Sequence, residues 1–273
     1  MSEYKNLLFI GGGNIAGAVA CGLVSSDSVP AENIAVYDID KSKLERFSSI
    51  GIKTYSLLSD AINDVQYIFL AVKPAIVKSV MKELAAFDGL LEKAIIVSFA
   101  ASVEIDHIER ACGKHIPVIR TMPSTPILVG EGVLAVCRND LVSAKEFQFF
   151  CRMMSSVAHV SVIDEDLMNP IISVHGSSPA YVYLFVKSML DAAEKQGIDT
   201  NVALPLILKT IKGSVTMIEK SDVPIEQLIS NVASPNGTTL AALNSFANDD
   251  FCGSIERAMQ ACTDRAHEIS KEL

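Results

Sequence analysis

The segment NLLFIGGGNIAGA (residues 6–18) constrains the fold of this 273-residue chain more than any other stretch. A short apolar run predicts a buried strand, three glycines follow directly, and small residues at helical spacing come next. In this order of strand, turn and helix, the pattern G-x-G-x-x-A is typical of a dinucleotide-binding turn. Gly11 would form the tight turn, Gly13 would let a pyrophosphate approach the backbone, and Ala16 would let the helix lie close to the sheet. A sharp turn that binds nothing is the alternative.

Short apolar runs alternate with helical patterns as far as residue 163. The expected strands are residues 6–10, 33–38, 51–55, 66–72, 94–100, 117–122, 133–137 and 159–163. These runs are apolar throughout rather than alternating, which indicates strands buried on both faces. Helical patterns such as residues 14–24 and 75–86 lie between them. We therefore expect a Rossmann-like α/β domain, with a doubly wound parallel sheet covered by helices.

Strand patterns stop after residue 163, and only helical patterns follow. The expected helices are residues 165–196, 201–220, 225–232, one opening near Pro235, and 254–271. The segment HGSSPA interrupts the first of these, and Pro179, which has no amide donor, predicts a kink there. We therefore expect two domains, a dinucleotide-binding α/β domain at residues 1–163 and an all-helical domain at residues 164–273.

Composition and charge argue against several classes of function. The formal net charge is −9 and no Lys/Arg-rich run occurs, so we expect no nucleic-acid partner. No stretch reaches the roughly 20 apolar residues that span a bilayer, and the first residues lack the layout of a secretory signal, so we expect no membrane partner. The six cysteines form no C-x-x-C pair and the five histidines no H-x-x-x-H, so we expect no metal site. These features together favour a cytoplasmic protein.

Asp38 ends the second expected strand, roughly 20 residues after the glycines, where an acidic residue accepts hydrogen bonds from the adenosine ribose of a dinucleotide. Taken alone, this carboxylate favours NAD(H) over NADP(H), because its charge repels a 2′-phosphate. Lys41 and Lys43 lie just downstream and could offset that repulsion. The alternative is that Asp38 only caps the helix that follows.

Two further strand ends carry candidate contacts, since the ends of parallel strands border the ligand crevice of such sheets. Lys73 and Pro74 follow the fourth strand, where Lys73 could contact the dinucleotide or remain in solvent. Ala100 and Ala101 follow the fifth strand, where small residues would let a ring approach closely. Plain packing explains the two alanines equally well.

The segment NVASPNGTTLAAL (residues 231–243) is the most distinctive motif of the helical half. Ser234 is predicted as an N-cap and Pro235 as the first helical residue. Small or hydroxylic residues then fill the first turn: Asn236, Gly237, Thr238 and Thr239. Glycine and threonine are poor helix formers, so local stability does not explain them. Free amides and two hydroxyls at a helix start would suit a small carboxylate, and an ordinary capped helix is the alternative.

These residues resemble those of the pyrroline-5-carboxylate reductase family. The likeness extends over essentially the whole chain and rests on GGGNIAGA, AVKP, MPSTPILVGEG, HGSSPAYVYLFVKSML and SPNGTTLAAL. Asn236 stands where the family pattern has a glycine. The resemblance implies a homodimer made by the C-terminal helices, often assembled further into a decamer, with each active site lying between the two domains.

The resemblance also implies roles for matching positions. The residues expected to line NADP(H) or NAD(H) are Ile10, Gly11, Gly12, Gly13, Asn14, Ile15, Ala71, Val72, Lys73, Pro74, Phe99, Ala100, Ala101 and Asn231, to which the strand-end argument adds Asp38. The residues expected near the substrate are Glu165, Ser234, Asn236, Gly237, Thr238 and Thr239. Thr238 and Thr239 would be catalytic, with the Thr239 hydroxyl facing the ring nitrogen.

The expected activity is that of an NAD(P)H-dependent oxidoreductase acting on a cyclic imine: reduction of 1-pyrroline-5-carboxylate to L-proline, the final step of proline synthesis. A protonated imine carbon is electrophilic enough that position and orientation supply most of the catalysis. Two alternatives remain open. One is a related imine or 2-hydroxyacid reductase, in which Lys187 of the long helix would be the proton donor. The other is a dinucleotide-sensing protein without catalysis.

Overall fold

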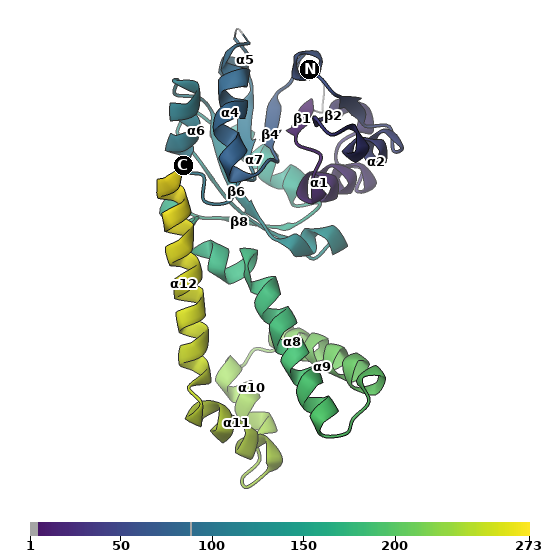
Figure 1. Cartoon of the computed structure of the whole chain (residues 1–273), viewed down its shortest axis with the longest axis vertical. Helices are drawn as coiled ribbons and strands as arrows, with labels where there is room; N and C mark the ends of the chain where they lie inside the picture. Colours follow the sequence, from purple (N-terminus) through teal and green to yellow (C-terminus); the bar gives the residue numbers. More distant parts are fainter. Residues whose placement is uncertain (1–4, 88) are drawn as a thin grey trace. The chain divides into compact units, whose positions relative to one another are not determined.

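The computed structural model describes residues 5–87 and 89–273. Its contacts divide the chain into two compact units, one running to Ser177 and including Cys262–Leu273, the other covering Ser178–Ala261. The first unit contains an eight-stranded sheet (Figure 1). Its strands are β1 (Leu7–Ile10), β2 (Ile34–Tyr37), β3 (Lys53–Tyr55), β4 (Tyr67–Leu70), β5 (Ile95–Ser98), β6 (Val118–Pro123), β7 (Val133–Arg138) and β8 (His159–Val162). All eight expected strands are confirmed, with ends that differ by one or two residues.

The sheet has the order β3-β2-β1-β4-β5-β6-β7-β8, and neighbouring strands are parallel except β6 and β7. The expected doubly wound parallel sheet is confirmed, with this one antiparallel pair as its exception. Only a 3₁₀ helix (Thr125–Val129) and a few flanking residues join β6 to β7. A parallel crossover needs a dozen or more residues, so a connection this short returns the chain antiparallel.

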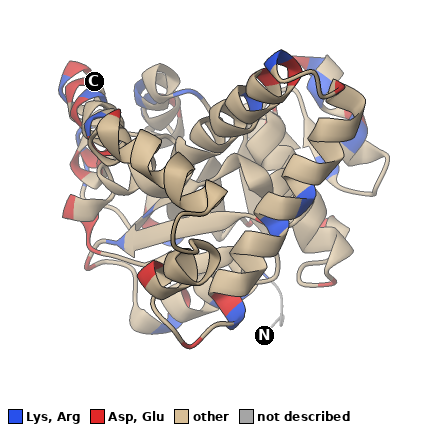
Figure 2. Ribbon diagram, turned by 90° about the horizontal axis from the view of Figure 1, so that it is seen from below, with Lys and Arg blue, Asp and Glu red and all other residues tan. Residues whose placement is uncertain are grey.

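Helices cover both faces of the sheet. Successive strand residues point to opposite sides, so each strand contributes to two separate buried clusters. Leu7 and Phe9 of β1 belong to one buried cluster, and Leu8 and Ile10 belong to another. The first cluster includes side chains of α1 (Asn14–Ser25), α2 (Glu45–Ser48) and α7 (Ala144–Met154). The second includes side chains of α3 (Leu58–Ala61), α4 (Pro74–Ala85), α5 (Leu90–Lys93) and α6 (Ile105–Cys112). Charged residues lie mainly on the helices and loops (Figure 2).

The segment after β8 is not one kinked helix, as expected for residues 165–196, but two short turns followed by a long helix. A 3₁₀ turn (Glu165–Leu167) and a π-helical turn (Ile172–Gly176) precede α8 (Ser178–Lys195). The amide of Ser177 donates to the carbonyl of Ile172 (2.8 Å), which closes the π turn. Pro179 then stands in the first turn of α8, where a missing amide donor costs nothing. The interruption is confirmed, but the proline begins a helix rather than bending one.

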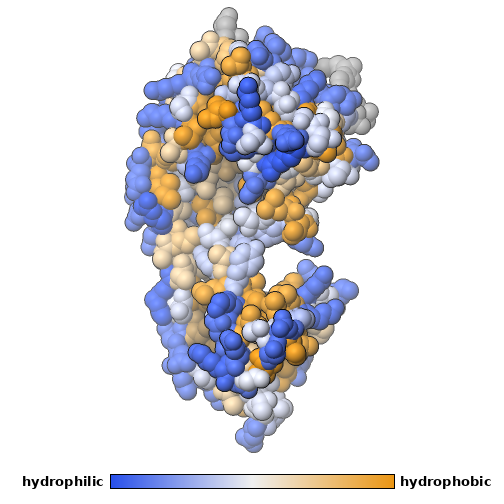
Figure 3. All heavy atoms as spheres, turned by 45° about the vertical axis from the view of Figure 1, so that its right-hand side comes forward, coloured by the Kyte–Doolittle hydropathy of each residue, from blue (hydrophilic) through white to orange (hydrophobic). Residues whose placement is uncertain are grey.

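The second unit is helical throughout its described residues. It consists of α8, α9 (Thr200–Lys220), α10 (Ile225–Val232), α11 (Thr238–Asn248) and the first half of α12 (Phe251–Glu272), whose last turns belong to the first unit. Many of its large apolar side chains are exposed, among them Leu184 of α8 and Leu206 of α9, and Figure 3 shows orange surface over this part. Within the described residues, no helix is both long enough and apolar enough to span a bilayer.

Candidate functional site

The carboxyl ends of β1, β2, β4 and β5 lie side by side at one edge of the sheet. Ile10 stands opposite both Tyr37 and Leu70 in the strand register, and Leu70 stands opposite Ser98. The loops after these strands are therefore neighbours, at the edge where doubly wound sheets bind ligands. They bring together the predicted dinucleotide contacts of the first unit: Gly11, Gly12, Gly13, Asn14 and Ile15 after β1, Asp38 after β2, Ala71, Val72, Lys73 and Pro74 after β4, and Phe99, Ala100 and Ala101 after β5.

The glycine turn is built so that its backbone faces open space. Gly11 has φ +102°, and a Cβ added there would lie 2.5 Å from the carbonyl oxygen of Ala71, so no other residue fits. A Cβ added at Gly13 would meet nothing within 4 Å. Gly13 is also the N-cap of α1, and no side chain among the described residues caps the amides of that helix start. Unpaired amides and the helix dipole favour an anion at this position.

Arg46 of α2 holds the other side of the glycine turn. One of its guanidinium nitrogens lies 2.5 Å from the carbonyl oxygens of both Gly12 and Gly13, and the group stands 4.8 Å from the ring centre of Phe47. A Cβ at Gly17 would come within 2.7 Å of the guanidinium carbon, so this glycine makes room for the arginine. Sequence analysis missed Arg46, and the signal that could have found it is the extra glycine in the first turns of α1.

Asp38 is buried, with 7% of its surface exposed, and its carboxylate is fixed from two sides. Oδ2 accepts a hydrogen bond from the Gly12 amide (2.7 Å), and Oδ1 accepts one from the Asp40 amide (2.8 Å). The ammonium of Lys43 lies 3.4 Å from Oδ2. Asp40, whose side chain accepts from the Ser42 amide (3.1 Å), is the cap of the following 3₁₀ turn. The alternative prediction that Asp38 caps that turn is therefore wrong.

The predicted contacts after β4 and those after β5 differ in how exposed their side chains are at this edge. Lys73 is exposed and precedes the first residue of α4, as its position in the sequence suggests. Phe99 is buried, and its ring centre lies 5.5 Å from that of Phe69 and 6.5 Å from that of Phe9. Because its ring is part of the core, only the backbone of Phe99 borders the loops at the edge. Ala100 is buried as well.

A second polar group surrounds Glu165, the predicted substrate contact of the first unit. Its Oε1 accepts a hydrogen bond from the Ile105 amide in the first turn of α6 (2.8 Å) and lies 3.1 Å from the guanidinium of Arg120. Arg120 comes from β6, has only 3% of its side chain exposed, and also donates to Asn169 Oδ1 (2.7 Å). The sequence already showed a signal for this arginine, since a charge inside the apolar run VIRTM needs a buried partner.

The Glu165 carboxylate faces a polar cavity of about 380 Å³. The residues that line it are Glu104, Asp106, Arg120, Glu165, Asp166, Asn169 and His267. The Ser270 hydroxyl donates to Glu104 (2.6 Å) and lowers the pKa of that carboxyl, and the charges of Arg120 and His107 act in the same direction. Burial, together with the charge of Glu165, raises the pKa of the Cys137 thiol on β7 to about 12. The cavity thus combines a fixed guanidinium with several carboxylates.

In the second unit, the predicted helix start at Ser234 and Pro235 is wrong, because α11 begins at Thr238. The Gly237 amide donates to the Ser234 carbonyl (3.0 Å), which closes a turn ahead of the helix. Asn236 in that turn has φ +57°, a left-handed conformation that ends helical geometry. Asparagine adopts this conformation more readily than other residues with a side chain, which explains how it replaces a glycine of the family pattern.

The start of α11 keeps the features that suggested a carboxylate site. Gly237 is its N-cap, and no described side chain caps the first amides. Thr238 and Thr239 are the first two helical residues, so both hydroxyls stand within the first turn. Asn231, the predicted cofactor contact of this unit, is exposed on α10 and accepts a hydrogen bond from Gln227 Nε2 (2.9 Å). These contacts with substrate and cofactor stay predictions.

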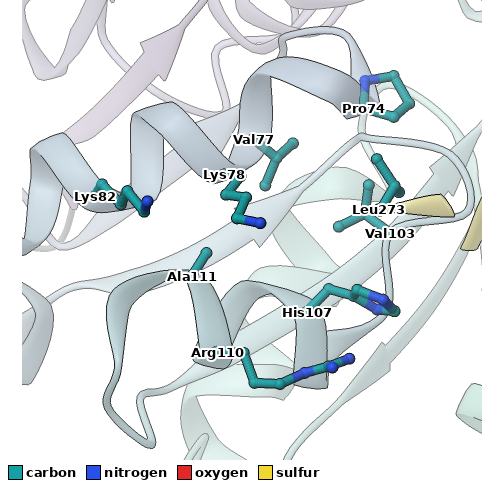
Figure 4. A pocket seen from close by; sticks show the side chains of 9 residues that line it. All are labelled: Pro74, Val77, Lys78, Lys82, Val103, His107, Arg110, Ala111 and Leu273. Atoms are coloured by element: carbon teal, nitrogen blue, oxygen red, sulfur yellow. The ribbon is translucent and has the colours of Figure 1, made fainter. Parts of the chain in front are cut away.

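Two other features lie largely outside the predicted site. Lys187, the proton donor of the hydroxyacid alternative, is exposed on α8 and pairs with Asp191 at 2.6 Å, one turn along. A pocket of about 240 Å³ between α4 and α6 shares only Pro74 with the predicted site, among its lining residues (Figure 4). It is lined by Lys78 and Lys82 of α4 and by His107 and Arg110 of α6, with apolar residues between them.

Two family models match separate parts of the chain. Residues 165–269 match the model described as pyrroline-5-carboxylate reductase dimerisation. Residues 6–102 match the model described as NADP oxidoreductase, coenzyme F420-dependent. The chain therefore carries a dimerisation region after its sheet, and the exposed apolar side chains of α8 and α9 belong to it.

Similar proteins cover the whole chain. It is 32% identical to pyrroline-5-carboxylate reductase of Escherichia coli over 98% of this chain and 99% of that one, and 31% identical to that of Corynebacterium melassecola over 96% and 97%. Among solved structures, pyrroline carboxylate reductase of Plasmodium falciparum with NADP bound is 30% identical, with a TM-score of 0.89 over 99% of this chain and 100% of that chain. With this identity over nearly its full length, the chain belongs to the pyrroline-5-carboxylate reductase family.

Proposed function

We propose that this chain reduces 1-pyrroline-5-carboxylate to L-proline with NADPH or NADH, the final step of proline synthesis. The observation that carries the proposal is full-length likeness: relatives named for this activity are 31–33% identical over 96–98% of the chain. Lys187, which the hydroxyacid alternative needs as proton donor, is exposed and paired with Asp191, so its contacts give that alternative no support. A protein that only senses a dinucleotide would leave the hydroxyl-rich start of α11 without a purpose.

The glycine turn fits a dinucleotide, on two observations of its geometry. Space is open in front of Gly13, and the first amides of α1 have no side-chain cap. We propose that these amides hold the pyrophosphate, while the backbone after β4 and β5, and Asn231 of α10, border the rest of the cofactor. When bound, the reduced nicotinamide supplies the hydride.

The start of α11 is the proposed substrate site. Its uncapped amides would hold the carboxylate, since a helix N-terminus favours negative charge. Asn236 is left-handed and Gly237 is extended, and these two residues lead the chain into the helix. The Ser234 carbonyl closes the preceding turn. We assign the Thr239 hydroxyl to the ring nitrogen and Thr238 to the same turn. Because a protonated imine needs no strong acid, holding and orienting the substrate is sufficient work for these groups.

The finer features of assembly and location are proposals as well. We propose a homodimer formed through the dimerisation region and assembled into a decamer, supported by exposed apolar side chains on α8 and α9. We propose functional domains at residues 1–163 and 164–273, the second of which begins one residue before the matched dimerisation region. A cytoplasmic location is supported by the six cysteines, all of them free.

The test is a steady-state assay of proline formation with Thr239→Ala. We expect turnover to fall about tenfold or more, while the dissociation constant of the cofactor changes less than about twofold, since the hydroxyl meets only substrate. Thr239→Ser, which keeps the hydroxyl, should recover most of the turnover. Unchanged turnover in Thr239→Ala would refute the assigned role. Turnover of 2-hydroxyacids but not of the pyrroline acid would refute the proposed reaction.

A further inference from the structure

We propose that Asp38 makes this chain bind NADH in preference to NADPH. The inference rests on the proposed function, since it concerns which reduced dinucleotide occupies the glycine turn. An acidic residue at the end of the second strand of such a sheet accepts hydrogen bonds from the adenosine ribose hydroxyls, whereas NADP(H) carries a phosphate at that 2′ position. Asp38 is the residue that follows β2, and its carboxylate is hydrogen-bonded to the glycine turn itself.

The contacts of Asp38 fix its position but leave it able to accept more. Each carboxylate oxygen takes one amide, Gly12 on Oδ2 and Asp40 on Oδ1. Lys43 also donates to both oxygens, at 3.4 Å and 3.5 Å. An ionised carboxylate has about four lone-pair sites, and these two long contacts come from a side chain that is 46% exposed, so a ribose diol can replace them as donor. The Gly12 amide is the second of the glycine turn, which places the carboxylate next to the backbone that would hold the pyrophosphate.

Two of the cations near Asp38, Lys43 and Arg46, are engaged by other groups, so they do not form a ready phosphate site. Lys43 lies 3.4 Å from Asp38 and 3.9 Å from Asp40, between two carboxylates. One guanidinium nitrogen of Arg46 donates hydrogen bonds to the carbonyls of Gly12 and Gly13. Two carboxylates and two lysines share the short segment from Asp38 to Lys43, so it has no surplus positive charge for a dianionic phosphate.

Because Asp38 is buried, its carboxylate should repel a phosphate more strongly than the exposed carboxylate of Asp40 does. Only 8% of the Asp38 side chain is exposed, against 48% for Asp40. A phosphate approaching the buried carboxylate would face a repulsion that water screens poorly, while the exposed one is screened well. Asp40→Asn is therefore a matched control, because it removes the same charge from the same loop.

The experiment compares the dissociation constants of NADH and NADPH, measured on the purified full-length protein by titration of nucleotide fluorescence and by calorimetry. Native protein should bind NADH about tenfold more tightly than NADPH, or more. In Asp38→Asn and Asp38→Ser the ratio should fall below about threefold, and the affinity for NADPH itself should rise. Asp40→Asn should change the ratio by less than about twofold. Lys43→Met should increase the preference for NADH, because the carboxylate loses its counter-charge.

A rise in NADPH affinity separates this role from a structural one, since a variant with a damaged loop loses affinity for both nucleotides. The proposal is overturned if the native protein binds NADPH as tightly as NADH. It is also overturned if both Asp38 variants weaken the two nucleotides equally and leave the ratio unchanged. Proline formation that prefers NADPH would sink this inference and leave the proposed function standing, whereas binding of neither nucleotide would sink both.

Discussion

Removing the carboxylate of Glu165 should destabilise the first unit, whatever its role toward substrate. Glu165→Ala leaves the Arg120 guanidinium, only 3% exposed as a side chain, without its carboxylate partner. Breaking a buried ion pair by deleting one partner costs about 3–5 kcal/mol. The Glu165 side chain is 36% exposed and faces a cavity of about 380 Å³, so water can reach the arginine and reduce the cost to the lower end of that range.

The lost hydrogen bond to the Ile105 amide adds about 1 kcal/mol, since that amide starts α6 and no other side chain in the described part of the chain caps it. We therefore expect Glu165→Ala to lower the free energy of unfolding by about 4 kcal/mol in total. For a unit of this size, 1 kcal/mol moves the melting temperature by about 2–4 °C, so the calorimetric transition should fall by about 8–16 °C.

Two companion variants identify the cause. Asp166→Asn lines the same cavity and should shift the melting temperature by less than about 2 °C, since the carboxylate it changes is exposed. The double variant Arg120→Met with Glu165→Leu removes both charges and should recover more than half of the lost stability. Strictly additive losses in the double variant, or a Glu165→Ala protein that melts within about 1 °C of the native one, would refute the ion-pair explanation.

Three further predictions follow from the same geometry. Gly11→Ala should lose dinucleotide affinity and about 2 kcal/mol or more of stability, because Gly11 has a positive φ and a Cβ there would be crowded. Gly13→Ala should melt like the native protein, but calorimetry should show that it binds the dinucleotide at least about tenfold more weakly. Ser270→Ala should remove the hydrogen bond that lowers the pKa of Glu104. A carboxyl whose pKa is lowered by folding stabilises the fold above its ordinary pKa near 4.5, and this contribution is lost as the pH falls through the lowered pKa. The difference in melting temperature between native and variant proteins should therefore shrink as the pH falls from 6 to 3. Cys137, whose pKa is raised to about 12 by burial, should resist iodoacetamide at pH 8 in the native state and react in urea, as peptide mapping would show.

The eight strands were predictable because the signal for each is local. A run such as LLFI or YIFL, buried on both faces, has no polar position to satisfy and is too short for a helix. The direction of β7 was not predictable from its own residues, because an apolar run reads the same in a parallel or an antiparallel pair. It follows instead from the short connection after β6, a property of spacing rather than of the strand.

The helix start at α11 shows how a strong local preference can mislead. Ser-Pro is a favourable N-cap and first helical pair, so the pattern predicts a helix three residues before the observed one. The competing preference belongs to Asn236, which tolerates positive φ and so ends the turn before the helix begins. Sequence alone gives no way to rank these two preferences, since each is worth about 1 kcal/mol.

The polar contacts that organise both regions of the first unit join residues far apart in sequence, which is why periodicity could not find them. Arg46 reaches the glycine turn from 33 residues away, and Arg120 pairs with Glu165 across 45. In each case the arginine alone is ambiguous, because an arginine on a helix or strand edge is ordinarily solvated. What makes it informative is a second oddity in the chain: Gly17 where a helix prefers alanine, or a charge inside an apolar strand. A long-range polar contact thus leaves residues in the sequence that are unusual for the helix or strand in which they lie. Such residues, taken in pairs, rather than motif matches, locate the groups that hold a site in shape.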